Sequence, residues 1–150
     1  MTDQFFITLF SNSSDNYFPE NRPFRYTSIL PETITLNGRW FIGLTELEYS
    51  KKSTSEGTAL HLAVFADIVK ASITANEKCS LLRYIPMVRS KAARRVFHTP
   101  ASINYMEVNK QVIDRISIVI KPYGTDPESL FGAQPSRLTV HMTKAPPLLL

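Results

Sequence analysis

Apolar and polar residues alternate along most of this chain with a period of two. Such alternation predicts β-strands, because successive side chains of a strand point to opposite faces of its sheet. Two runs are especially regular, residues 112–121 and 137–143. Their expected inward side chains are Ile116, Ile118, Ile120, Leu138, Val140 and Met142. The pattern therefore predicts a protein built mostly of strands.

Further segments carry the same signal. They are residues 5–10, 24–30, 33–36, 39–49, 60–69, 81–88 and 103–108. The first is apolar on both of its faces, so we expect it to be covered on both sides. Pro31 divides the second from the third, since proline interrupts a ladder of backbone hydrogen bonds. Pro86 places residues 81–88 at a sheet edge or a bulge, and residues 67–79 are expected to turn briefly helical.

Turn signals separate these segments. Asn37-Gly38 predicts a hairpin, because both residues tolerate a positive φ. Residues 125–132 predict one helical turn, with a capping Thr or Asp, then Pro127, then a terminating Gly132. Long polar stretches elsewhere predict loops.

Eight or nine strands with almost no helix predict an all-β fold, an antiparallel β-sandwich. The sandwich is either immunoglobulin-like or a jelly roll. The Cys–Trp–Cys pattern of immunoglobulin domains is absent, and several long loops favour a single jelly roll of about eight strands. We expect one domain over residues 1–144, followed by a short Pro/Leu tail at 145–150. That tail is either a docking peptide or has no role.

Length and composition exclude several classes of protein. A length of 150 residues fits one domain with a sizeable core. Cys79 is the one cysteine, so a disulfide framework within the chain and a multi-cysteine zinc site are both excluded. No apolar run approaches the length of a membrane helix, and the first ten residues lack the basic region of a secretory signal.

The positive charge is concentrated in one stretch. Between Lys78 and Met106 there are six basic residues and no acidic one, which exceeds the net charge of +4 of the whole chain. Its centre holds Arg89, Lys91, Arg94 and Arg95, followed by Phe97 and His98. Basic residues interleaved with aromatic ones suit single-stranded nucleic acid or an acidic partner. Since no known nucleic-acid-binding motif accompanies them, such binding would be directed at the backbone and sensitive to salt. The alternative is a solvated basic loop without a polyanionic partner.

Candidate catalytic chemistry is sparse. The three histidines lack the spacing of a helix-borne zinc site, no serine lies in a nucleophile elbow, and glycines are too few for a phosphate loop. Glu46 and Glu48 point to one face of a strand, where they form either an acid–base pair or the solvent side of an edge. The sequence therefore predicts a protein that is not an enzyme and has no catalytic residues, cofactor or metal.

A polar loop near the start holds candidate structural or interface residues. Asn12, Ser13 and Ser14 can bond to neighbouring backbone and turn the chain sharply. Tyr17 and Phe18 are expected to pack this loop over the end of the sandwich. Other residues with an expected structural role are Pro19, which stiffens the loop, Asn21, Trp40 as a core or interface anchor, and Gly43 as a bulge or close approach.

Two stretches resemble a known family. Residues 5–49 contain Ser11 to Ser14, the motif from Tyr17 to Asn21, and a strand from Leu36 to Tyr49. Residues 114–144 contain an Ile-x-Ile-x-Ile strand, a Leu-Phe-Gly loop and a closing strand that ends near His141. Together they resemble short uncharacterised proteins of Maverick/Polinton-type elements and adintovirus-like DNA viruses. The basic stretch at 89–95 has no counterpart in that pattern.

The resemblance implies a structural virion component, namely a minor capsid or penton-like vertex protein that self-associates in an icosahedral shell. Implied partners are a homo-trimer or homo-pentamer, other capsid proteins and, by non-specific contact, packaged DNA. The implied location is the virion, assembled in the nucleus or cytoplasm of a host cell. The alternative is a β-sandwich adaptor that binds a protein or nucleic acid through the basic loop at 89–95.

Overall fold

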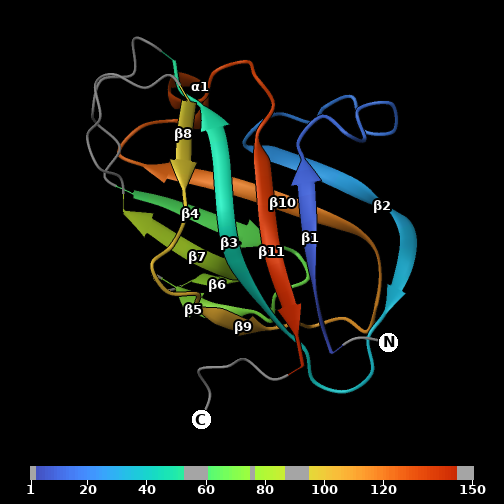
Figure 1. The fold of residues 1–150 in the computed structure, drawn as a ribbon. Coiled ribbons are helices and arrows are strands. Elements are labelled where there is room, and N and C mark those ends of the chain that lie inside the picture. Colours follow the sequence, from blue (N-terminus) through green and yellow to red (C-terminus); the bar gives the residue numbers. More distant parts are fainter. Residues whose placement is uncertain (1–2, 53–60, 75–76, 87–94, 145–150) are drawn as a thin grey trace.

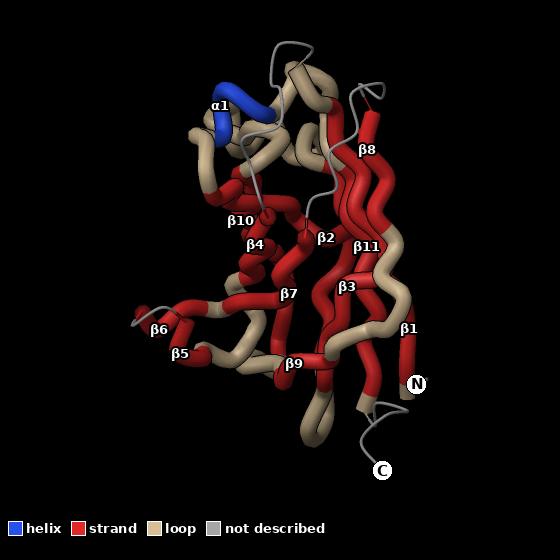
Figure 2. Tube along the Cα trace, turned by 90° about the vertical axis from the view of Figure 1, so that its left-hand side faces the viewer, coloured by secondary structure: helices blue, strands red, loops and turns tan. Residues whose placement is uncertain are grey.

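Alternating apolar side chains draw the chain into two antiparallel sheets packed face to face (Figures 1 and 2). The computed structural model describes residues 3–52, 61–74, 77–86 and 95–144. These residues form β1 (Gln4–Phe10), β2 (Arg25–Thr35), β3 (Phe41–Ser50), β4 (His61–Ala66), β5 (Ser72–Thr74), β6 (Glu77–Cys79), β7 (Leu81–Pro86), β8 (Arg95–His98), β9 (Tyr105–Glu107), β10 (Val112–Tyr123), α1 (Pro127–Leu130) and β11 (Arg137–Thr143).

The strand order is that of a jelly roll. Sheet A runs β1-β11-β3-β8, with β9 also paired to β3, and sheet B runs β2-β10-β4-β7. Each strand of the first half pairs antiparallel with one of the second: β1 with β11, β2 with β10, β3 with β8, and β4 with β7. The chain is thus one long antiparallel ribbon wound into two sheets, which confirms the predicted fold class.

The core lies between the sheets and follows the alternation. All six side chains expected to point inward from β10 and β11 are buried. Trp40, immediately before β3, is 1% exposed, and its indole N–H donates to the carbonyl oxygen of Asn37 at 3.0 Å. A buried indole keeps its apolar ring in the core only when its N–H has such an acceptor.

The first strand departs from its prediction. Ile7 and Leu9 point into the core, but Phe6 is 65% and Phe10 46% exposed. The expectation that β1 is covered on both faces is therefore wrong. Its second face is the outer face of sheet A, and β1 is the edge strand of that sheet. Apolar residues on both faces of a strand do not show whether another part of the protein packs against the second face.

The segment around Pro31 also differs. One strand, β2, runs through this proline, where two separate strands were predicted. The proline is tolerated because β2 is an edge strand and its pairing with β10 shifts register opposite this region. Gly38 has the expected positive φ of 84°, but Asn37-Gly38 carries the chain from sheet B to sheet A, so the predicted hairpin is wrong.

The segment between β4 and β7 contains two strands where a helical turn was predicted. β5 and β6 form a two-stranded hairpin within residues 67–79 that projects from the sandwich (Figure 2). The helical turn near residue 127 is present as α1, where the Asp126 carboxylate accepts a hydrogen bond from the Ser129 N–H at 2.7 Å. It ends at Phe131 instead of Gly132.

No helix within the described ranges has the length and hydrophobicity needed to span a bilayer. The tail at 145–150 lies outside those ranges.

Candidate interaction surface on sheet A

Of the predicted basic cluster, the structure describes one residue. Arg89, Lys91 and Arg94 lie outside the described residues. Arg95 is the first residue of β8, a strand that was not predicted from the sequence. Its Nε donates to Glu48 Oε1 at 2.7 Å and its Nη2 to the carbonyl oxygen of Pro135 at 3.1 Å. Arg95 is thus bound within the protein and not free to meet a polyanion.

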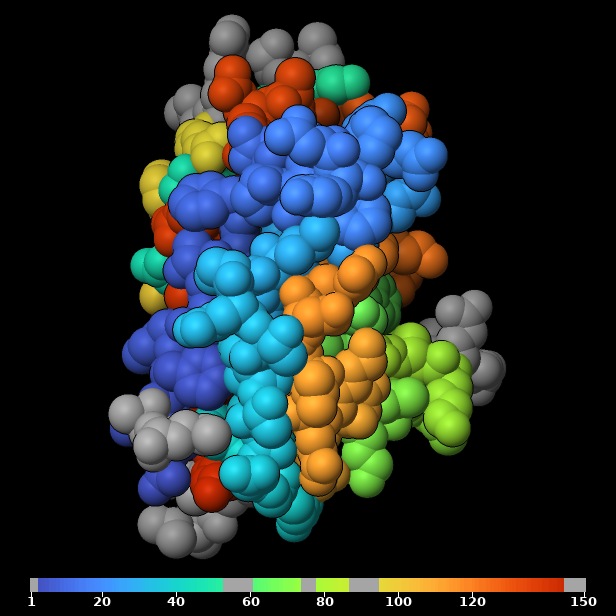
Figure 3. All heavy atoms as spheres, turned by 90° about the vertical axis from the view of Figure 1, so that its right-hand side faces the viewer, coloured from blue at the N-terminus to red at the C-terminus, as the bar shows by residue number. Residues whose placement is uncertain are grey.

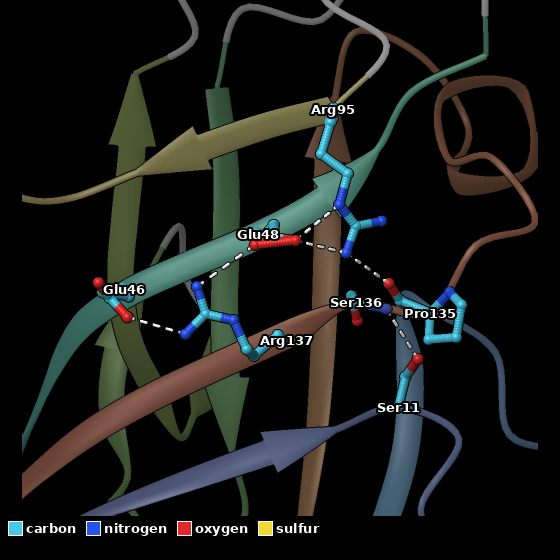
Figure 4. Close-up of polar contacts among 7 residues, drawn as sticks. All are labelled: Ser11, Glu46, Glu48, Arg95, Pro135, Ser136 and Arg137. Atoms are coloured by element: carbon cyan, nitrogen blue, oxygen red, sulfur yellow. Dashed lines mark hydrogen bonds and ion pairs between the residues drawn. The ribbon is translucent and has the colours of Figure 1, made fainter.

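Arg95 belongs to a network of four charges on the outer face of sheet A (Figure 4). Arg137 Nη1 lies 2.8 Å from Glu46 Oε2, and its Nη2 lies 3.3 Å from Glu48 Oε2. Two arginines and two glutamates balance, so the network adds no net charge to this face. Each member is anchored on a strand of the same sheet, and such anchoring keeps ion pairs in one geometry.

Register explains how both glutamates reach Arg137. Glu46 and Glu48 share a face, as predicted, but β3 lies in the interior of sheet A and not at an edge. The pairing of β11 with β3 shifts between Thr139 and Val140, which leaves Thr45 as an extra residue on β3. A bulge of this kind re-aims the side chains that follow it. Beyond it, both carboxylates point outward toward the arginines.

The network holds the carboxylate of Glu48 ionised. Burial alone would raise the pKa of Glu48, but hydrogen bonds from Arg95 and Arg137 outweigh it and hold the pKa below its ordinary value. Hydrogen bonding to Glu46 and Glu48 raises the pKa of Arg137, against the opposing effect of burial. A general acid needs a pKa near the working pH, and the pKa values of Glu48 and Arg137 are moved away from it. Glu48 is therefore suited to pairing with the arginines across the sheet and not to acid–base catalysis.

A second polar group lies on the same face at the far end of β11. His141 is 5% exposed; its Nδ1 lies 2.8 Å from the Tyr105 hydroxyl and its Nε2 lies 2.8 Å from Gln4 Oε1. The Phe6 ring packs on the imidazole with centroids 4.7 Å apart. Burial lowers the pKa of His141, and burial raises that of Tyr105. The imidazole is therefore neutral at pH 7, and hydrogen bonds at both nitrogens fix its orientation.

The polar loop after β1 is fastened to sheet B. Ser14 Oγ accepts a hydrogen bond from the Ile29 N–H at 2.9 Å. Asn21 forms two bonds with Thr27: its amide nitrogen donates to the Thr27 carbonyl, and its Oδ1 accepts from the Thr27 N–H, both at 3.0 Å. Ser13 Oγ donates to the carbonyl of Phe10 at 3.0 Å. The loop is thus held by side chains of its own motif.

Not every residue of that loop packs as expected. Tyr17 is 74% exposed, so it does not cover the end of the sandwich as predicted. Phe18 is half-buried, with the Arg115 guanidinium 5.8 Å from its ring centroid. Asn12 and Pro19 are exposed. Tyr17 is therefore an unburied aromatic side chain at one end of the molecule.

Gly43 lies where another segment approaches the sheet. A Cβ at this position would strike Ile103 and would lie 3.2 Å from the Tyr105 ring. The close approach, one of the two predicted reasons for this glycine, is present, and the bulge of β3 follows two residues later. Gly43 thus lets β9 pair with β3 and brings Tyr105 to His141.

The sequence interpretation missed Arg137, His141 and Phe6 as members of this surface. Their partners are distant in sequence, so no local pattern reveals them. Among the described residues, no group of three or more His, Cys, Asp and Glu side chains is placed to hold a metal ion.

Comparison with known proteins identifies the fold but no sequence family. Neither protein-family models nor curated protein sequences match the chain. Among solved structures, the chain is similar to the crystal structure of the mavirus penton protein, with a TM-score of 0.65 and 6% sequence identity. The match covers 95% of this chain and 100% of that one. At this identity the likeness shows a shared fold.

Proposed function

We propose that this chain is a non-enzymatic structural subunit of a viral shell, a minor capsid or penton-like vertex protein that self-associates. The observation that carries the proposal is the full-length likeness to the mavirus penton protein. The match extends over nearly all of both chains, so the likeness concerns the whole jelly roll and not a fragment of it. Fold alone does not determine function, so the role itself requires a test.

The outer face of sheet A supports a structural role. Its ionisable side chains are paired with one another, and the pKa values of Glu48, Arg137 and His141 are shifted away from those useful for proton transfer near pH 7. A surface of this kind offers shape and fixed hydrogen-bonding groups. Those are the properties that subunit contacts use.

The first test is the native mass of the purified chain, measured by light scattering on a sizing column over a series of concentrations and salt. A ring-closing interface gives a discrete closed species. We expect a trimer or pentamer, the latter fitting a vertex. A monomer under every condition would contradict autonomous self-association.

Contact with packaged DNA is a separate part of the proposal. It rests on Arg89, Lys91 and Arg94, since Arg95 is engaged with Glu48. Replacing those three residues with Gln should weaken binding to duplex DNA and flatten its salt dependence, because each phosphate contact releases counterions.

The matched control replaces the exposed Lys78, Lys110 and Lys144 with Gln, which removes the same charge elsewhere. Equal losses in both triple variants would show a general charge effect and no role for the basic cluster.

A further inference from the structure

β1 is an edge strand with one unused side. It pairs with β11 over all seven residues without a register shift. Just outside the strand, the Lys144 N–H donates to the Asp3 carbonyl and the Ser11 N–H donates to the Ser136 carbonyl, each at 3.0 Å. Since Asp3 and Ser11 both bond toward β11, the odd-numbered residues between them do so too.

The even-numbered residues therefore turn their backbone groups to the free side. Gln4, Phe6 and Thr8 present N–H and C=O groups that no other described strand pairs with. Phe10 is different, because its carbonyl accepts hydrogen bonds from Ser13. The usable edge thus extends from Gln4 to Thr8. This strand lies on the surface in Figure 3, where it is dark blue.

The other sheet edges carry features that discourage pairing with another chain. β2 contains Pro31 and Glu32 and a register shift, and β7 contains Arg83 and ends at Pro86. β8 has four residues and begins with Arg95. Prolines, charges, irregularities and short length are the usual protection of an edge strand. β1, QFFITLF, has seven residues and none of these features.

We propose that β1 is a self-pairing site, at which the β1 strands of two copies lie antiparallel across a two-fold axis. Phe6 of one copy lies opposite Phe6 of the other, and Gln4 lies opposite Thr8. This register places residues with free backbone groups opposite each other on both strands. It also leaves out Phe10, whose carbonyl is already bonded.

Charge supports a second copy of the same chain as the occupant. β1 has no charged side chain, so two copies meet without opposing like charges, which would destabilise a cross-strand pair. The nearby ion network on sheet A, formed by two arginines and two glutamates, is neutral as a whole. A charged strand from a different protein would find no unpaired opposite charge in this network.

Apolar burial adds to the backbone hydrogen bonds. Phe6 is 65% exposed and rests on the His141 ring, so its position is set before any partner arrives. The two Phe6 rings would be cross-strand neighbours in the joined sheet. Aromatic cross-strand pairs are among the stabilising ones. A partner strand thus covers the apolar side chain that the sandwich leaves open.

This pairing goes beyond the proposed capsid role and does not depend on it. It is a two-fold contact, whereas a trimer or pentamer uses a different, ring-closing contact. The two can fail independently and are distinguished by the mass of the species formed.

The test compares two charge substitutions with matched exposure. Phe6→Lys places two lysines opposite each other at the two-fold axis. Phe97→Lys makes the same change on β8, at the opposite edge of the same sheet, where the ring is 67% exposed. Native mass is measured over a concentration series under reducing conditions, since Cys79 is free. For the wild type and Phe97→Lys we expect paired species: dimers if no ring forms, hexamers if the ring is a trimer and decamers if it is a pentamer. For Phe6→Lys we expect this pairing to be about tenfold weaker or more.

A mixing experiment guards against a simple folding defect. Phe6→Lys and Phe6→Glu proteins should each be mostly unpaired, and a mixture should regain the paired species because opposite charges then face each other. If the proteins already form pentamers, the pairing predicts decamers that Phe6→Lys reduces to pentamers. A monomeric wild type, a dimer or pentamer insensitive to Phe6→Lys, equal loss with Phe97→Lys, or no recovery on mixing would each overturn the self-pairing of β1.

Discussion

Gly43 is the position where the packing of this fold is most sharply testable. A methyl group there would strike the Ile103 side chain and press on the Tyr105 ring. Gly43→Ala therefore forces the segment that carries β9 away from β3. Overpacking in a well-packed site costs about 1–3 kcal/mol. Alanine recovers roughly 0.5–1 kcal/mol of that, because glycine loses more backbone freedom on folding. The difference is about 0–2.5 kcal/mol, and because the new methyl group would meet two side chains at once, we expect a net loss of about 1–2 kcal/mol.

The assay is urea unfolding of the single and double variants, followed by circular dichroism. Ile103→Ala removes the methyl groups that the new Cβ would strike, so Gly43→Ala should cost about 0.5 kcal/mol or less in that background. Tyr105 remains and accounts for the residual cost. Gly38→Ala is the control: its position is open but has φ of 84°, so its cost is strain in the backbone and should be the same in both backgrounds.

Two results would refute this explanation of Gly43. One is a stability of Gly43→Ala within about 0.5 kcal/mol of the wild type, the ordinary range for substitutions away from special sites. The other is an equal cost of Gly43→Ala with and without Ile103→Ala, which would mean that the cost does not arise from this contact.

Three further predictions concern the polar contacts. The pKa of Glu48 in the folded protein lies below its ordinary value of 4.5, so its ion pairs stabilise the fold above pH 4.5 and are lost as the pH falls through the folded pKa. Glu48→Gln should therefore lower the free energy of unfolding by about 1 kcal/mol at neutral pH and by nearly nothing in acid. Urea unfolding at both pH values measures this difference. Burial lowers the pKa of His141 below 6.5, so the unfolded chain binds the proton more readily and the stability of the fold falls as the pH drops below that value. In His141→Gln the free energy of unfolding should change less with pH. An unchanged pH dependence would contradict this role of His141. Asn21→Ala removes both bonds to Thr27 and should cost about 1–2 kcal/mol and speed proteolysis of the loop, whereas Asn12→Ala, at an exposed position in the same loop, should do neither.

Periodicity was sufficient to predict the strands because burial imposes it directly. From Ile116 onward every second side chain of β10 is buried, and both β10 and β11 appear within two residues of their predicted bounds. In β11 all residues from Leu138 onward are buried. The fold class followed from the number of strands and from the missing immunoglobulin pattern. The sequence did not predict which strands share a sheet, because alternation shows which side chains are buried but not which strands are hydrogen-bonded to each other. The hairpin expected at Asn37-Gly38 was wrong for this reason: a turn of that type also connects strands of opposite sheets.

The candidate surface was less predictable, since its contacts join distant parts of the chain. Arg137 meets Glu46 and Glu48 about ninety positions away, and only the bulge at Thr45 aims the carboxylates correctly. The basic stretch suggested free cations, yet Arg95 is held by Glu48. Charge counted along a sequence predicts a local excess, but three-dimensional pairing decides which charges remain available.

The features of sheet A are compatible with the self-pairing proposed for β1. Its outer charges are satisfied internally, so a partner can cover this face without stripping water from an unpaired ion, which is the main cost of burying charge. Its imidazole is neutral and bonded at both nitrogens. The backbone N–H and C=O groups of Gln4, Phe6 and Thr8 on β1 pair with no other described strand, and Phe6 beside them is exposed. Backbone groups along an open strand edge can pair with another strand. They are the groups that the proposed self-pairing of β1 would use.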